Sequence, residues 1–281
     1  MQSNLSSAGV AMKKSAKSKP GGPPARVSVQ DLAFASKALV REAKYRVVLP
    51  VGYAETAHRY PVLYLLHGVF GGSENWETLT DLTRYAAGTD LIIVMPDAGN
   101  SWYVNSATVA TQRYEDLIGQ ELIPHVDEHL RTLRSSHRRA IAGLSMGGYG
   151  AVKFALKNLD MFSVAASISG AFDGPLDLET RREDLCHDLR KAFGGPDSDT
   201  RRENDVFELL TRVDAKLLPY FYLDCGTADE FCEVNRRLAT RLCARGARYE
   251  YHEVPGAHSW QYWDQRIAIV LPLIDKMLRP G

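Results

Sequence analysis

Short runs of apolar residues recur along the chain, and longer stretches with apolar residues at helical spacing lie between them. Several of the short runs are continuously apolar, which is typical of strands that are covered on both faces of a sheet. They predict seven strands, at residues 45–49, 61–66, 91–95, 139–144, 164–169, 220–224 and 248–254.

Helices are predicted between these strands, at residues 114–133, 148–158, 230–245 and 261–278. In the first of them Leu117, Leu122 and Val126 lie near helical spacing, and Pro124 predicts a kink. Strands that alternate with helices in this way indicate the α/β fold class, with a mostly parallel central sheet and helices on both faces.

Two segments depart from this alternation. Residues 15–26 consist mainly of Ser, Lys, Pro and Gly, so we interpret residues 1–26 as a disordered N-terminal tail. The remaining residues, 27–281, are expected to form a single domain. Within it, residues 171–204 are charged and interrupted by Gly and Pro, and we interpret them as an insertion over the sheet edge and a candidate cap or lid.

The composition is that of an ordinary globular protein, with 45% hydrophobic and 24% charged residues over 281 positions. Lys plus Arg equals Asp plus Glu, 34 each, so the formal net charge is zero. Neither a nucleic acid nor a membrane is therefore expected as a partner. No apolar core of a secretion signal follows Lys13 and Lys14, which favours a cytoplasmic location. The oligomeric state stays open.

The four cysteines are Cys186, Cys225, Cys232 and Cys243. None forms a CxxC pair and no histidine lies at metal-ligand spacing from them, so no metal site is expected. We interpret them as reduced and mostly buried, with a single disulfide as the open alternative.

The sharpest motif is Gly143-Leu144-Ser145-Met146-Gly147, which has the form G-x-S-x-G. An apolar strand precedes it and a helical pattern follows it, as in a turn that exposes a nucleophilic serine above a sheet. Side chains on either side of such a serine would collide with neighbouring backbone, which explains the two flanking glycines. The motif predicts Ser145 as a nucleophile, and a Gly-rich turn without chemistry is the alternative.

Acyl transfer by such a serine needs two backbone N–H donors for the oxyanion of the tetrahedral intermediate. The amide of Met146, next to the serine, is one predicted donor. The loop at residues 65–72 follows an early strand, and we predict the amide of Val69 as the second donor because Gly68 lets the backbone turn inward. His67 in this loop is interpreted as a structural residue.

The general base is expected among the three histidines that follow Ser145. His187 lies in the predicted insertion, and His252 lies inside a predicted strand. His258 lies in a loop before the last predicted helix, at the carboxyl end of the sheet, where a base can reach the serine. We therefore predict His258 as the base.

The acid that orients His258 is expected in the segment after the strand at residues 220–224. Asp229 lies beyond a Gly–Thr turn at the start of a helix, and it is the predicted acid. Asp224 and Glu230 are the alternatives, and capping of the helix is the alternative role of Asp229.

Five segments, in this order, resemble the esterase family that includes esterase D (S-formylglutathione hydrolase), tributyrin esterases, feruloyl and acetylxylan esterase domains and the antigen 85 mycolyltransferases. The segments lie within residues 43–278, at 64–68, 96–103, 143–150, 226–229 and 256–260. The resemblance implies an α/β-hydrolase fold, a triad of Ser145, Asp229 and His258, and oxyanion donors at Val69 and Met146. Such a triad needs neither a metal nor an organic cofactor.

The branches of this family differ in substrate. Tyr149 stands where S-formylglutathione hydrolases carry a histidine, and residues 101–103 look more like the tributyrin and carbohydrate-ester branch. We therefore expect a serine carboxylesterase for short-chain acyl esters, with acetylated or feruloylated carbohydrate as a candidate substrate. A thioesterase or acyltransferase is the alternative, and a binding module without activity is a third reading. Trp102, Tyr103 and Trp260 are expected to line the substrate pocket or to pack the loops.

Overall fold

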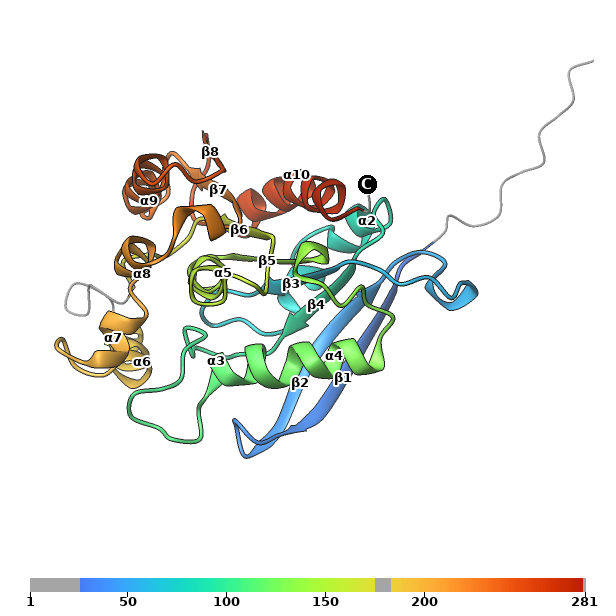
Figure 1. Cartoon of the computed structure of the whole chain (residues 1–281), viewed down its shortest axis with the longest axis horizontal. Helices are drawn as coiled ribbons and strands as arrows, with labels where there is room; N and C mark the ends of the chain where they lie inside the picture. The colour runs from blue at the N-terminus through green and yellow to red at the C-terminus, as the bar shows by residue number, and fades with distance from the viewer. Residues whose placement is uncertain (1–25, 175–182, 280–281) are drawn as a thin grey trace, which may run out of the picture.

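A computed structural model describes residues 26–174 and 183–279. Through this part runs an eight-stranded sheet of order β1-β2-β4-β3-β5-β6-β7-β8 (Figure 1). β1 (Ser28–Ser36) pairs antiparallel with β2 (Arg41–Leu49), which pairs antiparallel with β4 (Ile92–Pro96). The remaining pairs are parallel and join β4 and the strands β3 (Val62–Leu66), β5 (Arg139–Leu144), β6 (Val164–Ile168), β7 (Tyr220–Gly226) and β8 (Tyr249–Val254). The predicted mostly parallel sheet is confirmed.

Burial explains which strands the sequence revealed. Every residue of β3, β4, β5 and β6 is buried, so their apolar runs are continuous. β1 was not among the predicted strands, and most of its residues are exposed. As an edge strand it is held by its backbone ladder to β2, which leaves little hydrophobic pattern in the sequence.

Helices cover both faces of the sheet (Figure 1). The core on one face includes residues of α4 (Ile123–His129), α5 (Met146–Lys157), α8 (Val206–Arg212) and α9 (Cys232–Ala244). The core on the other face includes residues of α1 (Asn75–Thr78), α2 (Leu82–Ala86) and α10 (Trp260–Leu278). α5 follows β5 directly and packs against β5 and β6, so the strand-to-helix turn between them lies at the carboxyl end of the parallel strands.

The prediction of one helix at residues 114–133 is wrong in its end and in its regularity. The segment consists of α3 (Tyr114–Asp116), a π-helical segment (Leu117–Leu122) and α4, which ends at His129. Pro124 has no N–H to donate to the preceding turn, and the wider π-helical segment ends two residues before it, at Leu122. Beyond α4 the chain is extended, and Thr132 forms a bridge with Tyr60.

The predicted insertion contains two helices in its described part, α6 (Glu183–Phe193) and α7 (Asp199–Glu203). Residues 175–182 of this segment, and residues 1–25 of the predicted tail, lie outside the described residues. All four cysteines are free, and Cys243 alone among them is exposed. Within the described ranges, no helix combines the length and the apolar character needed to cross a bilayer.

Candidate active site

Ser145 lies in the turn between β5 and α5 with φ 54° and ψ −118°. This left-handed backbone is costly for a residue other than glycine, and it is held by two hydrogen bonds. The Ser145 N–H donates to the carbonyl of Ile168 at 3.0 Å, and the Ala171 N–H donates to the Ser145 carbonyl at 3.1 Å. The strained turn presents the Ser145 hydroxyl at the carboxyl edge of the sheet.

The two glycines that flank Ser145 are required by close backbone contacts. A Cβ atom at Gly143 would lie 2.4 Å from the carbonyl carbon of Gly147. A Cβ atom at Gly147 would lie 2.5 Å from the carbonyl oxygen of Leu66. Because these neighbours are backbone atoms that cannot rotate away, no larger residue fits at either position.

Three side chains far apart in the sequence form a chain of hydrogen bonds. Ser145 Oγ lies 3.0 Å from His258 Nε2, and His258 Nδ1 lies 2.9 Å from Asp229 Oδ2. The His258 ring is held edge-on between the rings of Phe231 and Trp263, at centroid distances of 5.0 and 4.8 Å. The structure thus brings together the three residues that the sequence predicted as a triad.

The charges along these hydrogen bonds determine which nitrogen of His258 carries a proton. Burial alone would raise the pKa of Asp229, but hydrogen bonding and charge from His258, together with the Phe231 N–H at 2.9 Å, hold it below its usual value. Asp229 is therefore an ionised acceptor at neutral pH. His258 Nδ1 must carry the proton, which leaves the Nε2 lone pair free to accept the proton of Ser145.

The first alternative acid, Asp224, forms hydrogen bonds with other partners. Asp224 is fully buried on β7 and accepts hydrogen bonds from Tyr222, Tyr262 and Arg266. This network ties β7 to α10 beneath the loops, and it does not include His258. The other alternative, Glu230, is exposed.

The remaining histidines do not reach the serine. His187 is exposed on α6, beside Asp188, and His252 is partly exposed on β8, where it contacts Glu250 at 3.1 Å. His67 is buried and its pKa is lowered, mainly by that burial. It bonds only to backbone, as its predicted structural role requires.

His67 orients the loop at residues 67–72, which we name the oxyanion loop because the sequence predicts an oxyanion donor, Val69, within it. Its Nε2 accepts the N–H of Ala98 at 3.0 Å, so the proton lies on Nδ1, which donates to the carbonyl of Gly68 at 2.7 Å. That carbonyl shares a trans peptide with the N–H of Val69, and the two point in opposite directions. The Val69 N–H is consequently turned away from the His67 ring.

A cavity of about 320 Å³ lies beside the triad. Ser145, His258 and Val69 contribute to its wall, together with Trp260. Three further apolar residues that were not predicted as lining residues from the sequence also contribute to the wall, Phe70, Leu79 and Trp263. A signal was available for two of them, because Phe70 adjoins a predicted donor and Trp263 lies one helical turn beyond Trp260.

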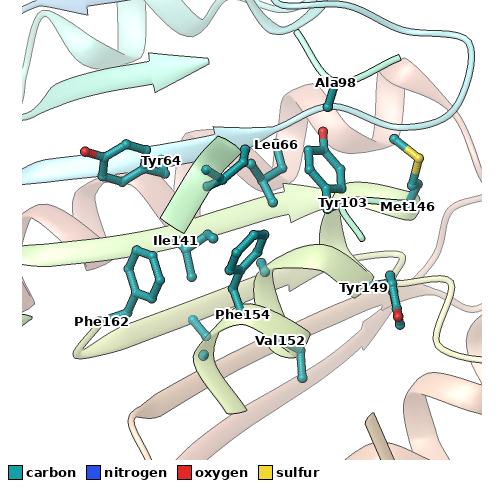
Figure 2. Packing of buried hydrophobic residues seen from close by; sticks show 14 of the residues in the cluster. Tyr64, Leu66, Ala98, Tyr103, Ile141, Met146, Tyr149, Val152, Phe154 and Phe162 are labelled. Carbon is teal, nitrogen blue, oxygen red and sulfur yellow. The ribbon is translucent and has the colours of Figure 1, made fainter. Parts of the chain in front are cut away.

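Trp102 and Tyr103 are not brought to this cavity. Both are buried with left-handed backbone, at φ 55° each. The Trp102 ring packs against Tyr149 and Phe193, and the Tyr103 hydroxyl donates to the His67 carbonyl at 2.9 Å. Figure 2 shows Tyr103 among buried side chains near Ala98 and Met146. These two aromatic residues pack beneath the loops, where their rings contact other buried side chains.

The sheet order, with a serine in a strained turn after the fifth strand, defines an α/β-hydrolase fold. Residues 36–273 match the family described as "Putative esterase". The chain belongs to this family, which confirms the esterase family that the five sequence segments resemble.

Two relatives illustrate the family. An esterase of Mycobacterium tuberculosis is 33% identical over 256 residues, which cover 80% of this chain and 54% of the relative, so the chain spans about half the length of that relative. An acetyl esterase of Caldicellulosiruptor saccharolyticus is 25% identical over 89% of this chain and 99% of its own length.

Solved structures of serine hydrolases and esterases have a similar fold. The fluorophosphonate-binding serine hydrolase F of Staphylococcus aureus has a TM-score of 0.81 at 27% identity, over 90% of this chain and 99% of its own. A ferulic acid esterase has a TM-score of 0.78 at 25% identity, over 90% and 98% of the two chains. An S-formylglutathione hydrolase of Staphylococcus aureus has a TM-score of 0.77 at 26% identity, over 90% and 99%.

Proposed function

We propose that the protein hydrolyses short-chain acyl esters, with Ser145 as nucleophile, His258 as general base and Asp229 as the acid that orients it. The observation that carries the proposal is the chain of hydrogen bonds from Ser145 Oγ through His258 to Asp229, at 3.0 and 2.9 Å, at the wall of an apolar cavity. In this geometry Nε2 can take a proton from the serine without rearrangement.

The reaction proceeds in two halves. Ser145 Oγ attacks the ester carbonyl while His258 takes its proton, and the amides of Val69 and Met146 receive the oxyanion. His258 then returns the proton to the leaving alcohol as the carbon–oxygen bond breaks, which leaves an acyl group on Ser145. Water, deprotonated by His258, attacks this acyl-enzyme. His258 then returns the proton to Ser145 Oγ as the acyl–serine bond breaks, and the carboxylic acid leaves. No step requires a metal or an organic cofactor.

The cavity wall favours an acyl group with a small apolar body. Its apolar side chains surround Ser145 and His258, and its volume is about 320 Å³. On the alcohol side we propose a carbohydrate, because residues 101–103 resemble the carbohydrate-ester branch of the family. The acetyl esterase and the ferulic acid esterase among the similar proteins support an acetyl or a feruloyl group on the acyl side. An S-formylglutathione-type thioesterase is the second candidate, favoured by the similarity to such a hydrolase.

The test compares hydrolysis of p-nitrophenyl acetate, butyrate and octanoate by the wild type and by Ser145→Ala. We expect turnover that falls with chain length and is lost in the variant by a factor of about 10⁴ or more. Turnover retained by purified, folded Ser145→Ala would contradict the assignment of the nucleophile. A thioester hydrolysed much faster than every oxygen ester would move the proposal to the second candidate.

A further inference from the structure

Asn100, in the segment at residues 96–103, takes no part in the chemistry above, but its side chain contacts both the oxyanion loop and the insertion. The side chain of Asn100 is half-buried between this loop and the insertion. Its Oδ1 accepts the N–H of Phe70 at 2.7 Å, and its Nδ2 donates to Asp188 Oδ2 on α6 at 2.6 Å. Asn100 thus bridges two segments that do not adjoin in the sequence.

The Phe70 backbone needs such a support. Its φ is +60°, in the left-handed region that favours glycine, and its side chain is 60% exposed. The chain turns there so that the Gly71 N–H reaches the carbonyl of Gly68 at 3.3 Å. A bulky residue in this position of a turn is strained, so the turn is retained only where other contacts stabilise it.

We propose that Asn100 is the positioning residue that holds the oxyanion loop in its donor geometry and couples it to α6 through Asp188. His67 fixes the peptide that carries the Val69 N–H, and Asn100 fixes the next peptide, which carries the Phe70 N–H. With both peptides held, only the two dihedral angles of Val69 separate them, and these are then determined as well. The inference rests on the proposed function, because it assigns the Val69 amide to the oxyanion.

The chemistry of the two partners requires an amide at position 100. A backbone N–H can only donate, and an ionised carboxylate can only accept. The asparagine amide offers one acceptor to Phe70 and one donor to Asp188, so both partners select the same orientation of its side chain. An aspartate at this position would keep the first bond and oppose the second with like charge.

The experiment measures kcat and KM for p-nitrophenyl butyrate in four variants beside the wild type. For Asn100→Ala we expect kcat to fall by about 10- to 100-fold with KM nearly unchanged, since the oxyanion forms only beyond the ground state. The inhibition constant of a trifluoromethyl ketone, whose adduct with Ser145 carries an oxyanion, should rise by the same factor. A residue that only stabilised the fold would lower the apparent kcat through loss of active enzyme, but it would leave this inhibition constant unchanged.

Two isosteric variants test the bridge itself. Asn100→Asp should also lower kcat, whereas the double variant Asn100→Asp with Asp188→Asn exchanges donor and acceptor and should recover most of the activity. The matched control is Asn105→Ala, because Asn105 lies in the same loop and its side chain both donates to and accepts from Asp116, at 3.0 and 3.2 Å, away from the oxyanion loop. Its kcat should stay near that of the wild type.

Wild-type kcat in Asn100→Ala, an equal loss in Asn105→Ala, or a double variant no better than Asn100→Asp would each overturn the role of Asn100. These results leave the proposed function standing as long as Ser145→Ala is inactive. Turnover retained in Ser145→Ala would overturn the proposed function, and with it the assignment of the oxyanion on which this inference rests.

Discussion

Two buried aspartates lie five residues apart in the chain, and their surroundings separate their roles. Asp229 accepts from His258 and from a backbone N–H, whereas Asp224 accepts from two tyrosines and an arginine. Both are shielded from water, so burial alone would not distinguish them. The hydrogen-bond partners of each carboxylate therefore determine which of the two can orient His258.

Asp229→Asn is expected to lower kcat by about 10⁴, because a neutral amide no longer fixes the His258 tautomer that accepts from Ser145. The fold should be retained, since the side chain keeps its shape. Asp224→Asn is the matched control: it removes a charge from the Tyr222–Arg266 network and should lower the melting temperature while leaving kcat largely intact at 25 °C. Turnover assays and thermal melts of both variants check this, and equal losses of kcat in the two would contradict it.

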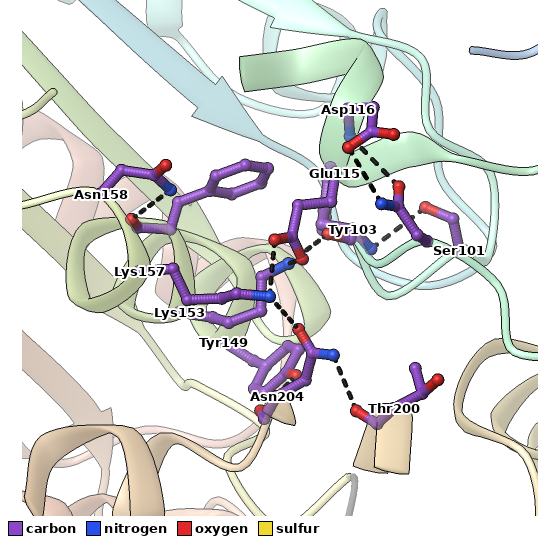
Figure 3. A network of polar contacts seen from close by, with 12 residues as sticks. Ser101, Tyr103, Glu115, Asp116, Tyr149, Lys153, Lys157, Asn158, Thr200 and Asn204 are labelled. Carbon is purple, nitrogen blue, oxygen red and sulfur yellow. Dashed lines mark hydrogen bonds and ion pairs between the residues drawn. The ribbon is translucent and has the colours of Figure 1, made fainter. Parts of the chain in front are cut away.

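At the level of elements, α5 carries an ion pair beneath the nucleophile turn. Lys153 is fully buried, and its ammonium donates to Glu115 at 2.7 Å and to the carbonyl of Tyr103 (Figure 3). Lys157 contacts the second oxygen of Glu115 at 2.6 Å. Burial lowers the pKa of Lys153 to about 8; it would raise that of Glu115, but the two ammonium groups bring the Glu115 pKa down to about 2.

Glu115→Gln is expected to lower the free energy of unfolding at pH 7 by about 3 kcal/mol, because it leaves the buried Lys153 ammonium without its counter-charge. The wild type gains stability from ionised Glu115 above its ordinary pKa of 4.5 and loses this gain as pH falls toward 2. The difference between wild type and variant should therefore shrink from pH 7 to pH 3.5. Urea melts measure it, and a difference that does not change with pH would contradict the role of Glu115.

A matched control for this pair lies on α8. Glu208 and Arg212 form an ion pair with about half of each side chain exposed, at 55% and 54%. Glu208→Gln should change the free energy of unfolding by less than about 0.5 kcal/mol. A loss as large as that of Glu115→Gln would mean that burial of Lys153 is not the cause.

Features that depend on neighbouring residues in the sequence could be predicted, whereas contacts between distant segments could not. The turn around Ser145 was recognisable because its glycines, strand and helix are contiguous, and buried strands such as β5 showed as apolar runs. The position of Trp102 was not recognisable, because its ring partners Tyr149 and Phe193 come from other elements. The contact of Asn100 with the N–H of Phe70 could not be predicted either, because every residue except proline carries a backbone N–H and the two residues lie thirty positions apart.

On the scale of the whole molecule, the fold and the triad do not choose between hydrolysis and acyl transfer. The acyl-enzyme on Ser145 would be identical in both reactions, and only the second nucleophile differs. The His258 side chain is 25% exposed, while the carboxylate of Asp229 is fully enclosed. Water therefore has access to the base at the point where the acyl-enzyme is to be attacked.

We accordingly expect water to compete well against an added alcohol. With p-nitrophenyl butyrate and a glycoside acceptor at increasing concentration, butyric acid should remain the main product, and the rate of p-nitrophenol release should change little. Product analysis by chromatography measures the ratio of acid to transferred ester, and Ser145→Ala supplies the background. An ester product that outweighs the acid at millimolar acceptor would identify a transferase, because the acceptor would then have to be held at the acyl-enzyme far more effectively than the water that surrounds it.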